Sequence, residues 1–136
     1  SMLVCYNGDL ITERDVSTVS ERYPDLPAVM IGRALIADPS LVARLTGGKA
    51  ADAKTIETFH DTLFMRYCEA FGDSRIAMLR MKEIWFYHLN LFENSEKPGK
   101  AIKKAKNAAE FQSAAAAVFR NCRVRANAVP LWFKPA

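Results

Sequence analysis

Residues 3–34 read LVCYNGDLITERDVSTVSERYPDLPAVMIGRA, and this stretch predicts two parallel strands joined by a helix. The apolar runs at 3–6 and 28–31 are short and end in turns that contain glycine, which is typical of strands. Between them, Thr12 and the acidic residues that follow it form a helix start, and we expect the helix to end near Arg22. Strands joined by a crossover helix of this length normally lie parallel in one sheet.

The chain after the second strand is predicted to be helical. Asp38 and Pro39 have the pattern of a helix start, and two glycines at 47–48 end that short helix. From residue 55 onward, apolar residues recur at spacings of three and four. The expected buried stripes are Ile56, Phe59, Leu63, Tyr67 and Phe71 in a helix that ends at Gly72, and Met78, Met81, Ile84, Trp85, Leu89 and Phe92 in a helix capped by Ser74.

Two further helices complete the predicted bundle. A break at 94–99 precedes a short basic helix over residues 101–106. Asn107 and Glu110 then have the spacing of a capping box at the start of the last helix. The apolar tail at 129–133 is expected to fold back onto a groove between helices.

The predicted fold is mainly α, with a βαβα unit over residues 1–50 followed by a helical bundle over residues 51–136. Half of the 136 residues are apolar, so the chain can bury a core. No apolar run approaches the roughly 20 residues of a membrane-spanning helix, and the N-terminus lacks the order of a signal peptide. We therefore expect no membrane partner and a cytoplasmic location.

The cysteines and histidines support neither disulfides nor a metal site. Cys5, Cys68 and Cys122 lie far apart, form no Cys-x-x-Cys pair and leave one cysteine over. His60 and His88 lie near neither a cysteine nor an acidic cluster, so no zinc site is expected. Both histidines fall among the apolar residues of their helices, which predicts a place in the core or at its rim.

Positive charge is concentrated at the C-terminal end of the chain. Residues 1–50 carry a net charge of −1 and residues 51–96 carry −3, whereas residues 97–136 carry +8. Such segregation favours a polyanionic partner, most simply nucleic acid, because many phosphates are neutralised together while counterions are released. A lysine surface that only keeps the protein in solution explains the same pattern, and charge alone leaves both interpretations open.

Two glycine-containing turns follow directly after the predicted strands. Asn7, Gly8 and Asp9 form the first turn, and Gly32 and Arg33 form the second. Parallel sheets and barrels bind their ligands at this end of the strands. Glycine lets the backbone approach an anion, and arginine can donate to two phosphate oxygens at once. The turns therefore predict a phosphate site, although an Asn-Gly turn by itself is common in proteins of any function.

The order of these motifs resembles the seventh and eighth strand units of tRNA-dihydrouridine synthases. The motifs that carry the resemblance lie at residues 6–10, 29–34 and 38–39, with Leu10 where isoleucine is usual and Ala-Leu-Ile-Ala at 34–37 in place of Gly-Ala-Leu-Gly. The resemblance as a whole covers the chain up to about Arg123. It implies that residues 1–50 are the last two βα units of a TIM-type (β/α)8 barrel that binds FMN. The flavin-phosphate residues would then be Asn7, Gly8, Asp9, Gly32 and Arg33.

The helical part extends this resemblance. Residues 81–87 are similar to a helix of the family that contacts tRNA, matching at Lys82 and Tyr87 and departing at Glu83, where histidine is common. Helical geometry places Asn90 on the same side as the basic residues of this helix, and three later lysines share one face. The expected RNA-binding residues are Arg75, Arg80, Lys82, Lys100, Lys103 and Lys104.

The family reaction also sets an expectation for catalysis. Reduced flavin delivers hydride to C6 of uridine, a loop cysteine protonates C5, and NADPH regenerates the flavin. None of the three cysteines matches the position of that acid, so no catalytic residue is predicted within this chain. Two of eight strand units cannot surround a flavin. We therefore expect the isolated chain to be inactive, to bind no flavin, and to pair its exposed strands with another copy or rearrange them.

Two other classes of function remain open on the sequence. A helical RNA-binding adaptor would use the C-terminal positive charge, but the two turns would then be coincidental. A helical protein-interaction module would need neither the turns nor the charge. Salt-dependent binding of tRNA distinguishes the RNA-binding classes from the protein-interaction module.

Overall fold

The structure is a computed structural model that describes residues 2–126. It is mainly helical, with one small sheet of two parallel strands, as predicted. The elements in chain order are β1 (Cys5–Asn7), α1 (Glu13–Arg22), β2 (Ala28–Met30), α2 (Arg33–Ala37), α3 (Leu41–Leu45), α4 (Ala53–Phe71), α5 (Ser74–His88), the 3-10 turn η1 (Leu89–Leu91), α6 (Glu96–Lys104) and α7 (Ala108–Asn121). The predicted docking of the tail at 129–133 lies outside the described residues.

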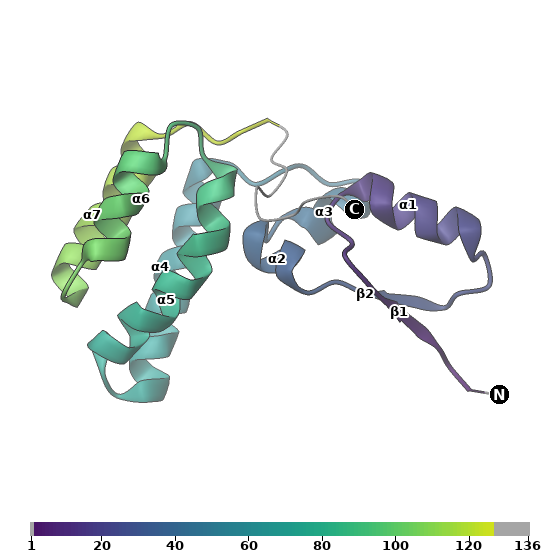
Figure 1. Cartoon of the computed structure of the whole chain (residues 1–136), viewed down its shortest axis with the longest axis horizontal. Helices are drawn as coiled ribbons and strands as arrows, with labels where there is room; N and C mark the ends of the chain where they lie inside the picture. The colour runs from purple at the N-terminus through teal and green to yellow at the C-terminus, as the bar shows by residue number, and fades with distance from the viewer. Residues whose placement is uncertain (1, 127–136) are drawn as a thin grey trace.

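Figure 1 shows two parts, and α2 lies between them and packs against the helical bundle. Helices α4, α5, α6 and α7 form a bundle on one side, and the strands with α1 and α3 lie on the other. Helix α2 packs against α5 and against η1. Within residues 2–126, no helix combines the length and the apolarity needed to cross a membrane.

The N-terminal part forms as the sequence predicts. Strands β1 and β2 pair in parallel, with Tyr6 opposite Val29. The start of α1 is a capping box, since the Thr12 hydroxyl accepts from the Asp15 amide at 3.2 Å and an Asp15 carboxylate oxygen accepts from the Thr12 amide at 2.8 Å. Helix α1 ends at Arg22, where the sequence placed its end.

Two predicted helix starts are wrong by one or two residues. Asp38 does not begin a helix, because its carboxylate accepts from the amide and the hydroxyl of Ser40 and forms a turn, so that α3 starts at Leu41. The cap of α5 is Asp73 rather than Ser74, since the Asp73 carboxylate accepts from the Arg75 amide at 2.7 Å. At Asp38 the side chain forms a turn instead of the predicted cap, and at Asp73 it takes the cap position from Ser74, because aspartate side chains compete for nearby backbone amides.

The predicted break at 94–99 is also wrong in part. Helix α6 begins at Glu96 and contains Pro98 and Gly99 in its first turn. Proline is tolerated there because the first amides of a helix have no intrahelical partner. Gly99 packs against Leu89, and a Cβ at this position would lie 2.7 Å from a methyl carbon of Leu89, so that side chain would have to shift.

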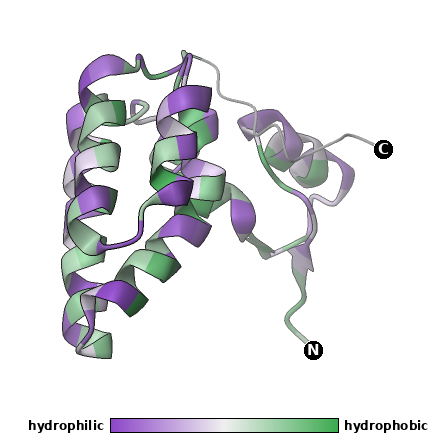
Figure 2. Ribbon diagram, turned by 60° about the vertical axis from the view of Figure 1, so that its left-hand side comes forward, coloured by the Kyte–Doolittle hydropathy of each residue, from purple (hydrophilic) through white to green (hydrophobic). Residues whose placement is uncertain are grey.

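The bundle core is built around one face of α5. Met78, Met81 and Trp85 are buried there, together with Phe92 after η1 and Phe111 of α7. Figure 2 shows hydrophobic and hydrophilic residues alternating around each helix of the bundle, as expected for helices with one face in a core. The predicted stripe of α5 is therefore confirmed at its central positions, although the α-helix ends at His88 and continues as a 3-10 turn.

The predicted stripe of α4 is shifted in the structure. Its buried residues are Ile56, His60 and Phe64, whereas Phe59 and Phe71 are about two-fifths exposed. The cause is contact with α7, because the rings of His60 and Phe64 pack on Phe111 with centroid distances of 5.8 and 5.5 Å. Helix α4 thus has two adjacent apolar rows. One is buried, and the other is only partly buried, with Leu63 and Tyr67 packed against the core.

Both histidines are buried, as predicted. His60 is 2% exposed and His88 is 0% exposed. The Nε2 atom of His60 and both ring nitrogens of His88 lack a hydrogen-bond partner among the described residues. Burial, with a smaller contribution from repulsion by His60, lowers the pKa of His88 to about 4, so the ring is neutral at pH 7.

Lys82 has a structural role at the end of α6. Its side chain extends from α5, and its ammonium donates to the carbonyl of Lys103 at 3.1 Å and to that of Ala105 at 2.5 Å. The last carbonyls of a helix have no intrahelical donor and carry partial negative charge. Lys82 therefore caps α6 from a neighbouring helix and fixes α6 against α5.

We predict that acid weakens the fold through His88. The unfolded chain takes up a proton near pH 6.5, whereas folded His88 does so near pH 4. As pH falls through this interval, unfolding is favoured by an amount on the order of 3 kcal/mol. Urea unfolding measured across this range should therefore show a shallower pH dependence for His88→Leu. Glu13 and Asp15 also have lowered pKa values, so both proteins keep some pH dependence of stability. Equal slopes in the two proteins would show that His88 adds nothing to this dependence and would contradict the prediction.

We predict that Lys82→Met destabilises the protein by about 1 to 2 kcal/mol, because two charge-assisted hydrogen bonds to α6 carbonyls are lost while the apolar stem is kept. Lys104→Met, at an exposed position of α6, is the matched control and should change the free energy of unfolding by less than about 0.5 kcal/mol. Urea unfolding measures both. A Lys82→Met protein as stable as the control would refute the capping role.

Candidate functional site: two glycine turns and a basic helix face

The two predicted turns lie next to each other at one edge of the sheet. Because β1 and β2 are parallel neighbours, the residues that follow each strand meet at the same edge. They enclose a hollow of about 330 Å³. Its lining contains all five residues assigned to the phosphate site, with three neighbours: Asn7, Gly8, Asp9, Leu10, Ile11, Gly32, Arg33 and Ala34.

An ion pair joins the two turns. The Arg33 guanidinium nitrogen Nη2 lies 2.6 Å from Oδ1 of Asp9, and both side chains are more than half exposed. Asp9 thereby holds the guanidinium at the hollow, but its own carboxylate also opposes an incoming anion. Exposed pairs of this kind contribute little free energy, so a phosphate can replace the carboxylate as the partner of Arg33.

The two glycines differ in how open their backbone is at the hollow. Gly32 has φ −109° and ψ −98°, and nothing lies within 4 Å of the place where its Cβ would be. Gly8 is covered by the Tyr6 ring, whose hydroxyl would lie 2.7 Å from a Cβ on Gly8. No side chain caps the start of α2, which follows Gly32 directly.

Arg44 connects the segments that follow the two turns. Its guanidinium donates to Glu13 at 2.6 Å and to Asp38, so it connects α1, α3 and the segment after α2. Its side chain is only 24% exposed, which makes this network less accessible to solvent than the Arg33 pair. Backbone hydrogen bonding and the pair with Arg44 lower the pKa of Glu13, so the network is charged at neutral pH.

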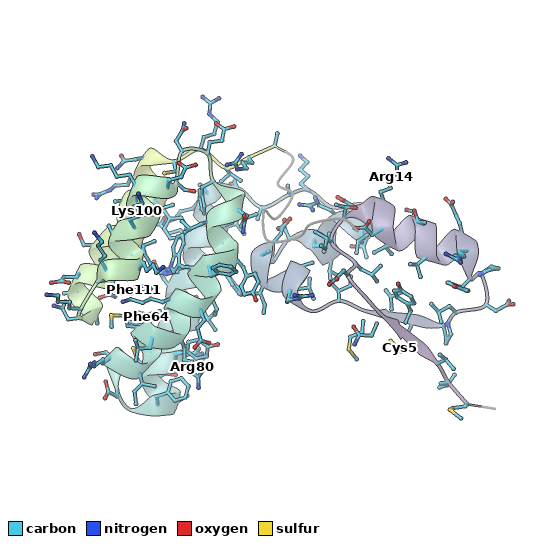
Figure 3. The ribbon with its side chains drawn as sticks, in the orientation of Figure 1. Cys5, Arg14, Phe64, Arg80, Lys100 and Phe111 are labelled. Atoms are coloured by element: carbon cyan, nitrogen blue, oxygen red, sulfur yellow. The ribbon has the colours of Figure 1, made fainter. Side chains whose placement is uncertain are left out.

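The six predicted RNA-binding residues do not form one surface. Lys100, Lys103 and Lys104 are exposed on α6, opposite its buried residue Ile102. Arg75 and Arg80 are exposed on α5, and Figure 3 places Arg80 and Lys100 at well-separated positions on the bundle. The α6 lysines are therefore a surface of their own, which we call the basic face.

Lys82 and Asn90 do not lie on an open RNA surface. Lys82 is half-buried, with its ammonium on the α6 carbonyls, and Asn90 is 8% exposed and donates to the Tyr87 carbonyl at 2.8 Å. The helical period predicted that both residues face outward, but Asn90 lies in η1, beyond the end of α5, and is buried. The helical period of the sequence does not predict that α6 and η1 pack against α5.

The cysteines are distributed over the molecule. Cys5 is exposed on β1, while Cys68 and Cys122 are half-buried. Burial raises the pKa of the Cys122 thiol, which donates to the Asn94 carbonyl at 3.8 Å. Among residues 2–126, no group of three or more histidine, cysteine or acidic side chains is arranged to hold a metal ion.

The sequence did not indicate a second hollow, of about 860 Å³, between α2, α4 and α5. We call it the α2–α4–α5 groove. Its walls include Leu35 and Ile36 of α2 and the row of Phe59, Leu63 and Tyr67 on α4. The sequence assigned this row to the core, and Leu63 and Tyr67 are partly buried against the core, whereas Phe59 is exposed. The neighbouring row of Ile56, His60 and Phe64 is the more deeply buried one.

Comparison with protein-family models, with curated proteins and with solved structures gave no match to this chain. The resemblance to tRNA-dihydrouridine synthases therefore rests on the motifs themselves and on the adjacency of the two turns.

Proposed function

We propose that this chain is the C-terminal part of an FMN-dependent tRNA-dihydrouridine synthase, which reduces uridine to dihydrouridine in tRNA. The observation that supports this function is the pair of glycine turns at one sheet edge, with Arg33 between them. Two amide-bearing turns and one guanidinium suit a phosphate monoester, which is the anionic end of FMN.

In this proposal the chain's own residues bind and orient the cofactor. Gly32 lets the backbone come close to the phosphate, and Gly8 would do the same once the Tyr6 ring moves aside. Arg33 neutralises the phosphate, and Asp9 positions Arg33. The bound flavin would supply hydride for C6 of uridine, with NADPH as the source of electrons. The acid that protonates C5 and the remaining walls of the flavin site belong to the other strand units of the barrel.

The basic face supplies the second half of the proposed function. Lys100, Lys103 and Lys104 lie on one exposed side of α6 at helical spacings, which suits contacts along a phosphate backbone. Such contacts are independent of base sequence and hold tRNA through its charge. In the intact enzyme they would keep the tRNA beside the flavin site.

We predict that inorganic phosphate binds weakly at the hollow of this chain. Titration followed by amide NMR should shift the resonances of Gly8 and Gly32, and Arg33→Gln should abolish these shifts, because the guanidinium is the main positive charge of the hollow. Arg14→Gln, on the exposed surface of α1, is the control and should leave them unchanged. A phosphate response that Arg33→Gln leaves intact would refute the site.

We predict that the double variant Lys100→Glu/Lys103→Glu binds tRNA more weakly and reduces the slope of log affinity against log salt by about 2, because two phosphate contacts are lost. Lys49→Glu/Lys54→Glu makes the same change in charge at exposed positions in and before α4 and serves as the control. Fluorescence anisotropy measures both variants. Equal effects of the two double variants would show that only net charge matters and would contradict a specific basic face.

A further inference from the structure

We propose that the α2–α4–α5 groove binds an unstacked base of the RNA, an inference that rests on the proposed RNA-binding function. The groove lies outside the hollow assigned to the flavin phosphate. Helix α2 separates the two, because Gly32, Arg33 and Ala34 line the hollow whereas Leu35 and Ile36 line the groove. A nucleotide whose base enters the groove would therefore lie beside the proposed cofactor site.

The size and the walls of the groove suit a flat ring. Its volume of about 860 Å³ lies within the range of pockets that hold small molecules. Its walls include the ring of Phe59, which is 41% exposed, and the half-buried ring of Tyr87. Exposed aromatic faces bind bases by stacking, and this contact works with any base.

His88 at the base of the groove points to a ligand that carries hydrogen-bonding atoms. Its ring is fully buried and lies 6.1 Å from the Phe59 ring between centroids. The backbone of Ile36 acts on the ring, but neither ring nitrogen has a hydrogen bond of good geometry among the described residues. An unpaired polar group in an apolar site costs free energy that a ligand can recover. An aliphatic side chain of a protein partner has nothing to donate or accept, whereas the edge of a base has both. Because the His88 ring is fully buried, side chains at the groove must move before a base can reach it.

The rim of the groove carries a cation for the attached phosphate. Arg80 lies there, paired with Glu83 at 3.3 Å, and both side chains are more than half exposed. This pair is weak because solvent screens it, so Arg80 can turn to a phosphate group. Glu83 opposes that step, and Glu83→Gln should therefore strengthen nucleotide binding.

The first experiment uses uridine 5′-monophosphate and adenosine 5′-monophosphate, with ribose 5-phosphate as the probe that lacks a base. Both nucleotides should shift the amide resonances of Phe59 and Ile84 and the ring nitrogen resonances of His88, whereas ribose 5-phosphate should not. Phe59→Ala should remove these shifts. Phe71→Ala should preserve them, because Phe71 is equally exposed on α4 but does not line the groove. Shifts confined to the hollow or to the basic face would overturn the proposal.

The second experiment compares an oligouridine with an abasic oligonucleotide of the same length. Phe59→Ala should weaken binding of the oligouridine by roughly tenfold and leave the abasic strand unaffected, because stacking needs the base. Equal losses for both strands would overturn the proposal. The basic face is tested separately: if Lys100→Glu/Lys103→Glu behaves like its control while the groove responds to bases, the tRNA function fails and the base site stands.

Discussion

Burial of one face of α5 is the constraint on which the rest of the structure depends. Met78, Met81 and Trp85 lie on this face, and α5 contacts α2, α4, α6 and α7. The edge of Trp85 packs on both buried histidines, with centroid distances of 5.3 Å to His60 and 5.9 Å to His88. Neither histidine has hydrogen bonds at both of its ring nitrogens. Burying these polar atoms costs free energy, and the aromatic packing around them offsets that cost.

The position of α5 also fixes both candidate sites. Lys82 on one side of α5 holds α6, and this contact orients the basic face toward solvent. On another side, α2 packs against α5, and α2 carries the glycine turn at its start and the groove wall at its centre. The phosphate hollow, the groove and the basic face are thus attached to one helix, although their residues come from distant parts of the chain.

The sequence predicted the features that depend on neighbouring residues. The Thr12 cap of α1, the end of α4 at Gly72 and the Asn107 cap of α7 are decided within four residues, and all three were correct. The full capping box predicted at Asn107 does not form, because the Glu110 carboxylate accepts from the Lys106 amide. Features that depend on packing between distant segments were missed. Gly99 was interpreted as part of a break because its contact with Leu89 is tertiary. Lys82 was assigned only to RNA because the α6 carbonyls follow it by more than twenty residues.

The sheet gives the strongest physical reason to regard residues 1–50 as part of a larger architecture. Parallel strands are normally covered on both faces, yet Val4 and Met30 are more than half exposed at the two strands. A pair of three-residue strands has too little buried surface to be stable by itself. In the proposed barrel, further strands would pair with the open edges, and helices would cover the exposed face. The same closure would convert the shallow hollow at Arg33 into an enclosed site, where its charge acts more strongly on a phosphate.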